Sequence, residues 1–260
     1  MVRKKYWSAL FGNERFTSAM TSNLIEEYRA KVEELSAYDF SYYNIKTLQE
    51  SMSKELVRGV EECIVAIFDK LSYQYSYSDE LSNNIHYYNG WKTNKSWIIN
   101  KKVIIPWMNA WNNASNRFQP TKYELCTKLS DIEKALDYLD SGRTNLPTEI
   151  SSQALRKAEE EEVTKKIHLK HFDVTFYKKG TCHLEFRDLE LLKKLNIFGS
   201  QQKRWLPPSY GNKHYQDMEP EEKAVIDSFE GKEEYEKTLN NANFYIYDPC
   251  KSIPALEYVG

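Results

Sequence analysis

Residues 167–188, IHLKHFDVTFYKKGTCHLEFRD, decide the fold, because they contain a β-hairpin whose register can be deduced. If residues 178–180 (Lys-Lys-Gly) form a three-residue loop with a left-handed glycine, Tyr177 stands opposite Thr181. Alternate strand residues share a face, and one face then collects only apolar side chains: Phe172, Val174, Phe176, Cys182, Leu184 and Phe186. A two-residue loop would mix the faces, so the sequence predicts the three-residue loop.

The other face of this hairpin is polar and contains the candidate catalytic residues. They are two carboxylates and two imidazoles: His171, Asp173, His183 and Glu185. The register places Asp173 opposite Glu185, and such groups could hold a divalent metal or do acid–base work on a phosphodiester, as in a metal-dependent nuclease. The alternative is the solvated side of a two-faced sheet. In either case two facing acids need a nearby cation, which Arg187 or His171 could supply.

Outward from the hairpin, the sequence predicts further strands and several helices. A second hairpin is expected from residues 97–99 and 103–105, ended by Pro106. Apolar residues at helical spacing predict a helical hairpin over 24–35 and 45–71, the first helix starting at a capping box of Asn23 and Glu26. Later helices are expected at 130–142, at 147–162, at 189–195 with Gly199 as a cap, and from Pro220 onward. Pro207 and Pro208 predict an extended arm at 199–211.

The predicted fold class is therefore α+β, with an N-terminal antiparallel helical hairpin and a small antiparallel sheet built from two β-hairpins and covered by helices. The predicted domains are a lead-in at 1–13, one domain at 14–215 (helical hairpin 14–80, sheet and helices 81–215), and an acidic helix and tail at 216–260.

The composition of the 260 residues is that of an ordinary globular chain. No apolar run approaches the ~20 residues of a membrane span, and no secretory signal is recognisable. The four cysteines form no C-x-x-C pair, so neither a zinc ribbon nor a redox motif is predicted. We expect a cytoplasmic protein without a membrane partner, and we predict no cofactor and no metal site.

The charges are segregated along the chain, although the net charge is only −2. Residues 81–123 contain six lysines or arginines and no acid, and residues 191–216 contain five and no acid. Residues 217–260 contain eleven acids and four lysines. A folded chain with such blocks should have a positive region and an acidic region.

Cations next to aromatic rings are typical of nucleic-acid-binding surfaces. The predicted nucleic-acid-binding residues come from three basic segments: Trp91, Lys92, Lys95, Lys101, Lys102, Lys178, Lys179, Lys203, Arg204 and Trp205. DNA is expected more than RNA as the partner. The alternative is an aromatic core with solvated lysines at its edge, and for 203–205 a packed connector. The hypothesis requires the three segments to lie on one surface.

Three strings, NGWKTNKSWIINKKVIIP, HFDVTFYKKGTCHLEF and WLPPSYG, resemble a bacterial family of domains of unknown function, over roughly residues 14–215. The family is found in phages, plasmids and genomic islands, and some members carry the domain behind an adenine-specific DNA methyltransferase. The resemblance implies a mobile-element protein that works near DNA, and it assigns no catalytic residue. It leaves open a protein-interaction role, with a methyltransferase or a host defence protein as partner.

Motifs for several enzyme classes are missing. The sequence has no phosphate-binding loop, no dinucleotide fingerprint, no H-E-x-x-H and no nucleophile elbow. The string at Leu206-Pro207-Pro208-Ser209 begins with leucine, which offers no acceptor for a target amine, so the chain on its own is not expected to be a methyltransferase. Whether it is an enzyme at all stays open, with a binding protein favoured.

Overall fold

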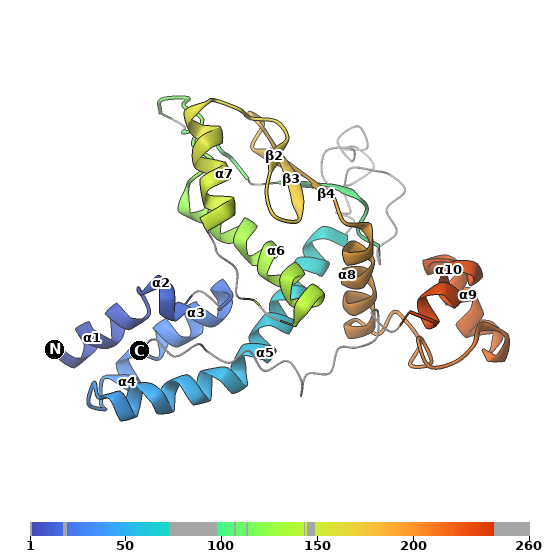
Figure 1. Ribbon diagram of the computed structural model, residues 1–260, viewed down its shortest axis with the longest axis horizontal. Helices are drawn as coiled ribbons and strands as arrows, with labels where there is room; N and C mark the ends of the chain where they lie inside the picture. Colours follow the sequence, from blue (N-terminus) through green and yellow to red (C-terminus); the bar gives the residue numbers. More distant parts are fainter. Residues whose placement is uncertain are drawn as a thin grey trace, which may run out of the picture.

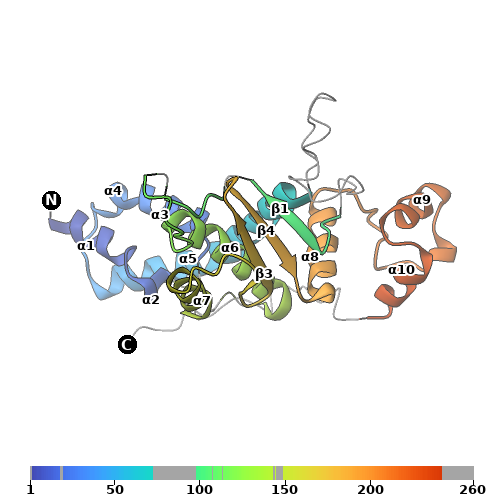
Figure 2. The ribbon, with the colours of Figure 1, turned by 90° about the horizontal axis from the view of Figure 1, so that it is seen from above.

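The computed structural model describes residues 2–17, 20–72, 98–106, 108–112, 114–142, 144 and 149–241. The predicted α+β class is confirmed: helices cover one face of a small antiparallel sheet. Figures 1 and 2 show an elongated molecule with the N-terminal helices at one end, the sheet and its helices in the middle, and two acidic helices at the other end.

The N-terminal end is built on one long helix, α5 (Tyr42–Ser72), as the apolar stripe at 45–71 predicted. Helices α3 (Ser22–Ala30) and α4 (Val32–Leu35) pack beside it, so the single helix expected at 24–35 is divided at Lys31. The N-cap of α3 is Thr21, and the predicted capping box of Asn23 and Glu26 is not formed. The lead-in is itself helical, because α1 (Val2–Leu10) buries Trp7 in the main core, and α2 (Glu14–Thr17) follows it.

The sheet has the strand order β1-β4-β3-β2 and is antiparallel throughout. Its strands are β1 (Lys102–Ile105), β2 (Ile167–His168), β3 (Phe172–Tyr177) and β4 (Thr181–Phe186). Tyr177 pairs with Thr181, and Gly180 has φ +81°, so the predicted three-residue loop and its register are confirmed. All six apolar residues of the predicted face are buried.

The hairpin predicted at 97–105 is not formed by the described residues, although its second arm is a strand. Residues 98–100 have no strand structure, and β1 pairs with β4 instead. The buried amide of Asn196 takes the place of a strand partner: its Oδ1 accepts from the backbone N–H of Ile99 at 2.7 Å, and its Nδ2 donates to the Ile99 carbonyl at 3.1 Å. A side chain thus satisfies backbone groups that a hairpin would have paired.

The middle of the molecule also contains helices α6 (Tyr123–Ser141), α7 (Glu149–Glu160) and α8 (Leu189–Gln202). Gly142 ends α6 with a left-handed φ of 70°, as predicted. The prediction that Gly199 caps a short helix is wrong, since α8 continues through it. A Cβ at Gly199 would lie 2.1 Å from Cγ of Phe68, so the glycine permits a close approach of α8 to α5.

The extended arm predicted at 199–211 is also wrong in its first part, which is helical to residue 202 and then packed. Lys203 Nζ lies 2.8 Å from Asp69 on α5. Trp205 is partly buried, with its ring centroid 5.7 Å from that of Phe68. The structure therefore favours the packed connector over the exposed arm.

The acidic end consists of a 3-10 turn, η2 (Tyr215–Asp217), and helices α9 (Pro220–Phe229) and α10 (Lys232–Leu239). Pro220 opens α9, as predicted, next to a capping box formed by Glu219 and Glu222. This end has a small apolar core of its own: Ile197, Leu206, Tyr210, Met218, Ile226, Phe229 and Tyr235. We call residues 206–241 the C-terminal unit.

Candidate nucleic-acid interface on the sheet

The polar face of the sheet carries a row of four charged or ionisable side chains, one from each strand. In register across β1, β4, β3 and β2 these are Lys102, Glu185, Asp173 and His168. Lys102 and His168 stand at the two ends of the row, with the two facing acids between them. Figure 2 looks onto this sheet with α5 and α6 behind it.

Glu185 is bound by the two lysines of the predicted basic segment. Lys102 Nζ lies 3.1 Å from Glu185 Oε2, and Lys101 Nζ lies 3.6 Å from Oε1. The hydrogen bond from Lys102 holds the pKa of Glu185 below its usual range, so this carboxylate stays ionised near neutral pH. Both lysines remain about half exposed at their side chains.

Asp173 has different partners from those expected. His168 Nδ1 lies 2.7 Å from Asp173 Oδ1, and Arg187 lies 3.6 Å from the same oxygen. Of the two cations proposed from sequence, Arg187 is therefore present. The prediction that His171 lies beside Asp173 for this purpose is wrong, because His171 turns toward α6.

A pair of rings lies on the same face of β3 and β4, between the charged row and the turn that joins these strands. The ring centroids of Tyr177 and His183 are 4.3 Å apart, on neighbouring strands in a diagonal position. Burial and the charge of Lys102 lower the pKa of His183, so its imidazole is neutral near pH 7. Tyr177 is 38 % exposed, whereas Ile104, opposite His183 on β1, is buried. The accessible part of the face thus lies over β3 and β4.

The turn between β3 and β4 presents Lys178 and Lys179, which are both exposed. The backbone N–H of Met108 donates to the Gly180 carbonyl at 2.9 Å, so the turn is attached to the segment that follows β1. Lys102 pairs with Glu185 near one end of β4, and the turn precedes Thr181 at the other end. Four residues of extended strand separate these two positions, which is roughly 14 Å.

His171 belongs to a buried charged cluster that sequence reasoning did not find. Its Nε2 donates to Asp137 Oδ1 at 2.6 Å, and Lys170 Nζ donates to the same oxygen at 2.6 Å. The Lys170 backbone N–H and the Ser151 hydroxyl both donate to Glu133 Oε1, at 2.9 and 2.6 Å. Burial raises the pKa of Glu133.

This cluster connects α6, α7 and the turn before β3, and the Asp137 side chain is only 6 % exposed. The signal in the sequence would have been two acids four apart, at 133 and 137, in a helical stretch. In the structure every residue from 132 to 138 is buried, so acids at these positions need partners. Because Asp137 and Glu133 are buried and bind groups of Lys170 and His171, the cluster positions the turn before β3.

Among the residues that the structure describes, no group of three or more His, Cys, Asp or Glu side chains is arranged to hold a metal ion. The nuclease candidates are instead divided: Asp173 and Glu185 have separate cations, the His183 ring lies against that of Tyr177, and His171 is bound to Asp137. The nuclease hypothesis consequently has no geometric support from these residues.

The predicted nucleic-acid-binding residues fall into three groups. Lys101, Lys102, Lys178 and Lys179 lie on the sheet and its turn. Lys203, Arg204 and Trp205 follow α8, with Lys203 and Trp205 packed against α5, and do not belong to the sheet face. Trp91, Lys92 and Lys95 lie outside the described residues. The predicted convergence of three basic segments on one surface is therefore not confirmed, and the sheet with its turn is the remaining candidate surface.

The fold and the charged face define an α+β domain built on a helix-backed antiparallel sheet. The family model "Domain of unknown function (DUF4942)" matches residues 1–205, and the chain belongs to this family. The match starts at α1, which the sequence had placed outside the domain, and ends before the C-terminal unit. Comparisons with curated proteins and with solved structures gave no match. None of the described helices is long and apolar enough to cross a membrane.

Proposed function

We propose that this chain is a nucleic-acid-binding domain and that it binds through the polar face of the sheet. The observation that carries the proposal is the pair of neighbouring rings, Tyr177 and His183, which lies between Lys101 and Lys102 at one end of β4 and the lysine turn at the other. Rings that are accessible to unstacked bases, between cations that are accessible to phosphates, suit a single-stranded nucleic acid. A duplex would bind through the cations alone.

The charge of this region supports the proposal. Residues 101–105 and 163–188 contain eight lysines or arginines and three acids, a balance of +5 on a chain whose net charge is −2. The cations are Lys101, Lys102, Lys165, Lys166, Lys170, Lys178, Lys179 and Arg187. A basic region of this kind attracts a polyanion at long range and releases its counterions on contact.

Binding would require an exchange of partners on the sheet. Lys101 and Lys102 are already engaged by Glu185, so a phosphate has to compete with that carboxylate. Lys178 and Lys179 are exposed on the turn, whose backbone is attached to the segment after β1. We therefore expect the turn to meet the nucleic acid first and the row at Lys102 to determine the final affinity.

In biological terms, we propose a domain accessory to DNA modification, restriction evasion or replication of a mobile element, with DNA favoured over RNA as the target. A cytoplasmic location belongs to the same proposal. A DNA methyltransferase or a host defence protein would be a further partner, and the C-terminal unit is the region that we propose for it because it is the acidic one.

The test is a titration of labelled duplex and single-stranded DNA with the full chain over a series of salt concentrations. We expect measurable affinity with a steep salt dependence. The double charge reversal Lys101→Glu with Lys102→Glu should weaken binding at least about tenfold. It should also reduce the salt slope by about 2, because each lysine that no longer neutralises a phosphate lowers the slope by about 1.

The matched control reverses two exposed lysines of α10, Lys232→Glu with Lys237→Glu, which changes the net charge by the same amount. This control should change affinity far less. Equal reductions of affinity in the two double variants would mean that only total charge matters, and no binding by the unmodified chain would overturn the proposal.

A further inference from the structure

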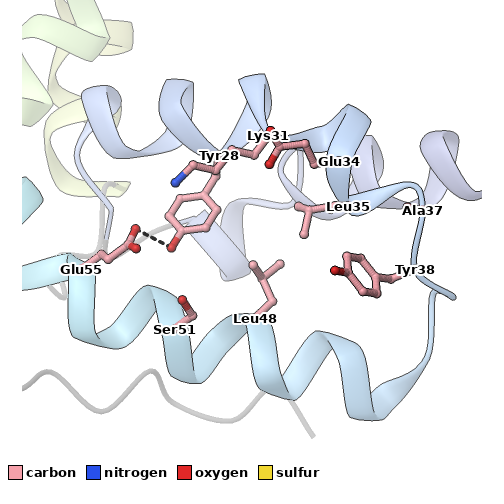
Figure 3. Close-up of a pocket in the computed structure, with 9 residues that line it drawn as sticks. All are labelled: Tyr28, Lys31, Glu34, Leu35, Ala37, Tyr38, Leu48, Ser51 and Glu55. Carbon is pink, nitrogen blue, oxygen red and sulfur yellow. Dashed lines mark hydrogen bonds between the residues drawn. The ribbon is translucent and has the colours of Figure 1, made fainter.

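At the N-terminal end, a cleft of about 470 Å³ lies between α3 and α4 on one side and α5 on the other. Figure 3 shows its lining: Leu48 of α5 and Leu35 of α4 form an apolar floor, with the ring of Tyr28 on one side and that of Tyr38 on the other. This volume is in the range of sites for small ligands and short peptide segments.

One wall of the cleft is held in place before any ligand binds. The hydroxyl of Tyr28 donates to Glu55 Oε2 at 2.7 Å, and this hydrogen bond, drawn in Figure 3, crosses from α3 to α5. Lys31 Nζ lies 4.9 Å from the centroid of the same ring and is also 2.8 Å from Glu27. A ring fixed in this way loses little conformational entropy on binding.

The other wall continues into an unusually exposed group of aromatic side chains. Tyr38 is 61 % exposed, and four more large aromatic residues near the connection between α4 and α5 are at least 37 % exposed. These are Tyr6, Phe40, Tyr42 and Tyr43. The rings of Tyr6 and Phe40 stack at 5.5 Å, which joins α1 to this surface. Exposed aromatic groups of this size mark interaction surfaces, since much of their apolar area stays open to solvent.

The charges around the cleft select for a cation. The carboxylate of Glu34 on the rim has no ion-pair partner among the described residues, and Glu55 has only a distant one, Arg58 at 3.9 Å. The one lysine of the lining, Lys31, is already neutralised by Glu27. A ligand with a positive group next to an apolar part would therefore match both features of the site.

We propose that this cleft and the neighbouring aromatic surface bind a short extended peptide that contains prolines and a flanking arginine or lysine. Tyrosine-lined grooves suit the polyproline II conformation, which is formed before binding and exposes flat apolar faces. A bound helix would need anchors over two turns or more, whereas the apolar floor here consists of two leucines between two rings. This binding site goes beyond the sheet face and does not depend on it.

The probe is a fluorescein-labelled peptide, Arg-Ala-Leu-Pro-Pro-Leu-Pro, titrated with the full chain by fluorescence polarisation. The comparison peptide replaces its arginine with glutamate. We expect the arginine peptide to bind and the glutamate peptide to bind at least about tenfold more weakly. Tyr38→Ala should reduce affinity about tenfold, because an exposed ring at the edge of a cleft is removed, and Glu34→Lys about threefold.

Both positions are exposed, so neither substitution should unfold the chain. The matched control is Tyr123→Ala at the start of α6, an exposed tyrosine away from the cleft, which should leave affinity unchanged. A Kd weaker than about 1 mM for the arginine peptide, or equal reductions of affinity from Tyr38→Ala and Tyr123→Ala, would overturn the proposal. So would concentration-dependent dimerisation that Tyr38→Ala abolishes, since the surface would then be occupied by a second copy.

Discussion

The sheet region and the C-terminal unit carry opposite charges for different structural reasons. The sheet segments 101–105 and 163–188 have a balance of +5, whereas residues 217–241 contain nine acids and three lysines, a balance of −6. In the C-terminal unit the acids are placed where the fold itself favours them. Glu221 and Glu222 lie in the first turn of α9, and Glu233 and Glu234 in the first turn of α10, where the helix dipole stabilises negative charge.

Further interactions satisfy the acids of the C-terminal unit. Glu222 accepts hydrogen bonds from Ser209 and from the Glu219 backbone N–H, which lower its pKa to about 2. Glu230 binds Lys193 of α8 at 2.7 Å. The exposed lysines of the sheet turn, by contrast, lie at no helix end. A charge block is therefore weaker evidence of a binding surface where helix ends and local pairs account for its charges, as they do in the C-terminal unit.

The largest effect should come from Gly199, on the helix that both regions share. By helix propensity alone, Gly199→Ala would stabilise the chain by about 1 kcal/mol. Because the new methyl group would meet the Phe68 ring, we expect a net destabilisation of about 2 kcal/mol, which lowers the Tm by roughly 5 °C in a chain of this size. Thermal denaturation followed by circular dichroism measures this.

The control for that substitution is Gly59→Ala in α5, where the nearest atoms to the new Cβ are those of the Leu24 side chain at 3.3–3.5 Å. It should change the Tm much less. If Gly199→Ala were as well tolerated as Gly59→Ala, the close packing of α8 on α5 would be wrong, and with it the placement of the C-terminal unit relative to the sheet.

A smaller effect, confined to one region, is expected from Tyr235→Phe. The Tyr235 hydroxyl donates to the Lys213 carbonyl at 2.6 Å and accepts from the Gly211 N–H at 3.1 Å, so its removal leaves two partly buried backbone groups unpaired. We expect a loss of about 1–2 kcal/mol. Hydrogen exchange should become faster across 206–241, with β3 and β4 unchanged, because the C-terminal unit has a separate core. Faster exchange in both regions would show that they are one cooperative unit.

The smallest effect concerns the charges of the sheet row. Glu185→Gln removes the carboxylate that competes with phosphate for Lys101 and Lys102. DNA affinity at low salt should rise about two- to threefold, in line with the modest free energy of exposed ion pairs. Glu234→Gln in the C-terminal unit, a change of equal charge, should leave the affinity nearly constant. A decrease for Glu185→Gln would mean that this acid orders the lysines for binding.

Sequence reasoning succeeded where one local pattern determines the structure. The alternation in 172–186 fixes which residues face the core, and a one-residue shift would expose all of them, so the hairpin register followed directly. Pro220 and the stripe of α5 were equally informative. The partner of β1 was not predictable in this way, because alternation defines a strand's faces and not its neighbour.

Other features could not be predicted because they depend on interactions between residues that are distant in the sequence. The pairing of His171 with Asp137 joins positions 34 apart, and nothing near His171 distinguishes that acid from the adjacent Asp173. Gly199 illustrates a different ambiguity, since a glycine after a helical stretch can be a cap or a point of close packing. Only the position of Phe68, on another helix, decides between them. The exposed aromatic group around Tyr38 was likewise not predicted, because sequence does not show burial.

If the sheet binds a polyanion as we propose, the hydrogen bond between Met108 and the Gly180 carbonyl would affect the rate of capture. A turn that fluctuated freely would offer its two lysines in a productive orientation only part of the time. With its backbone attached to the segment after β1, the turn would keep Lys178 and Lys179 at one fixed end of the sheet, and an approaching polyanion would meet the two residues together.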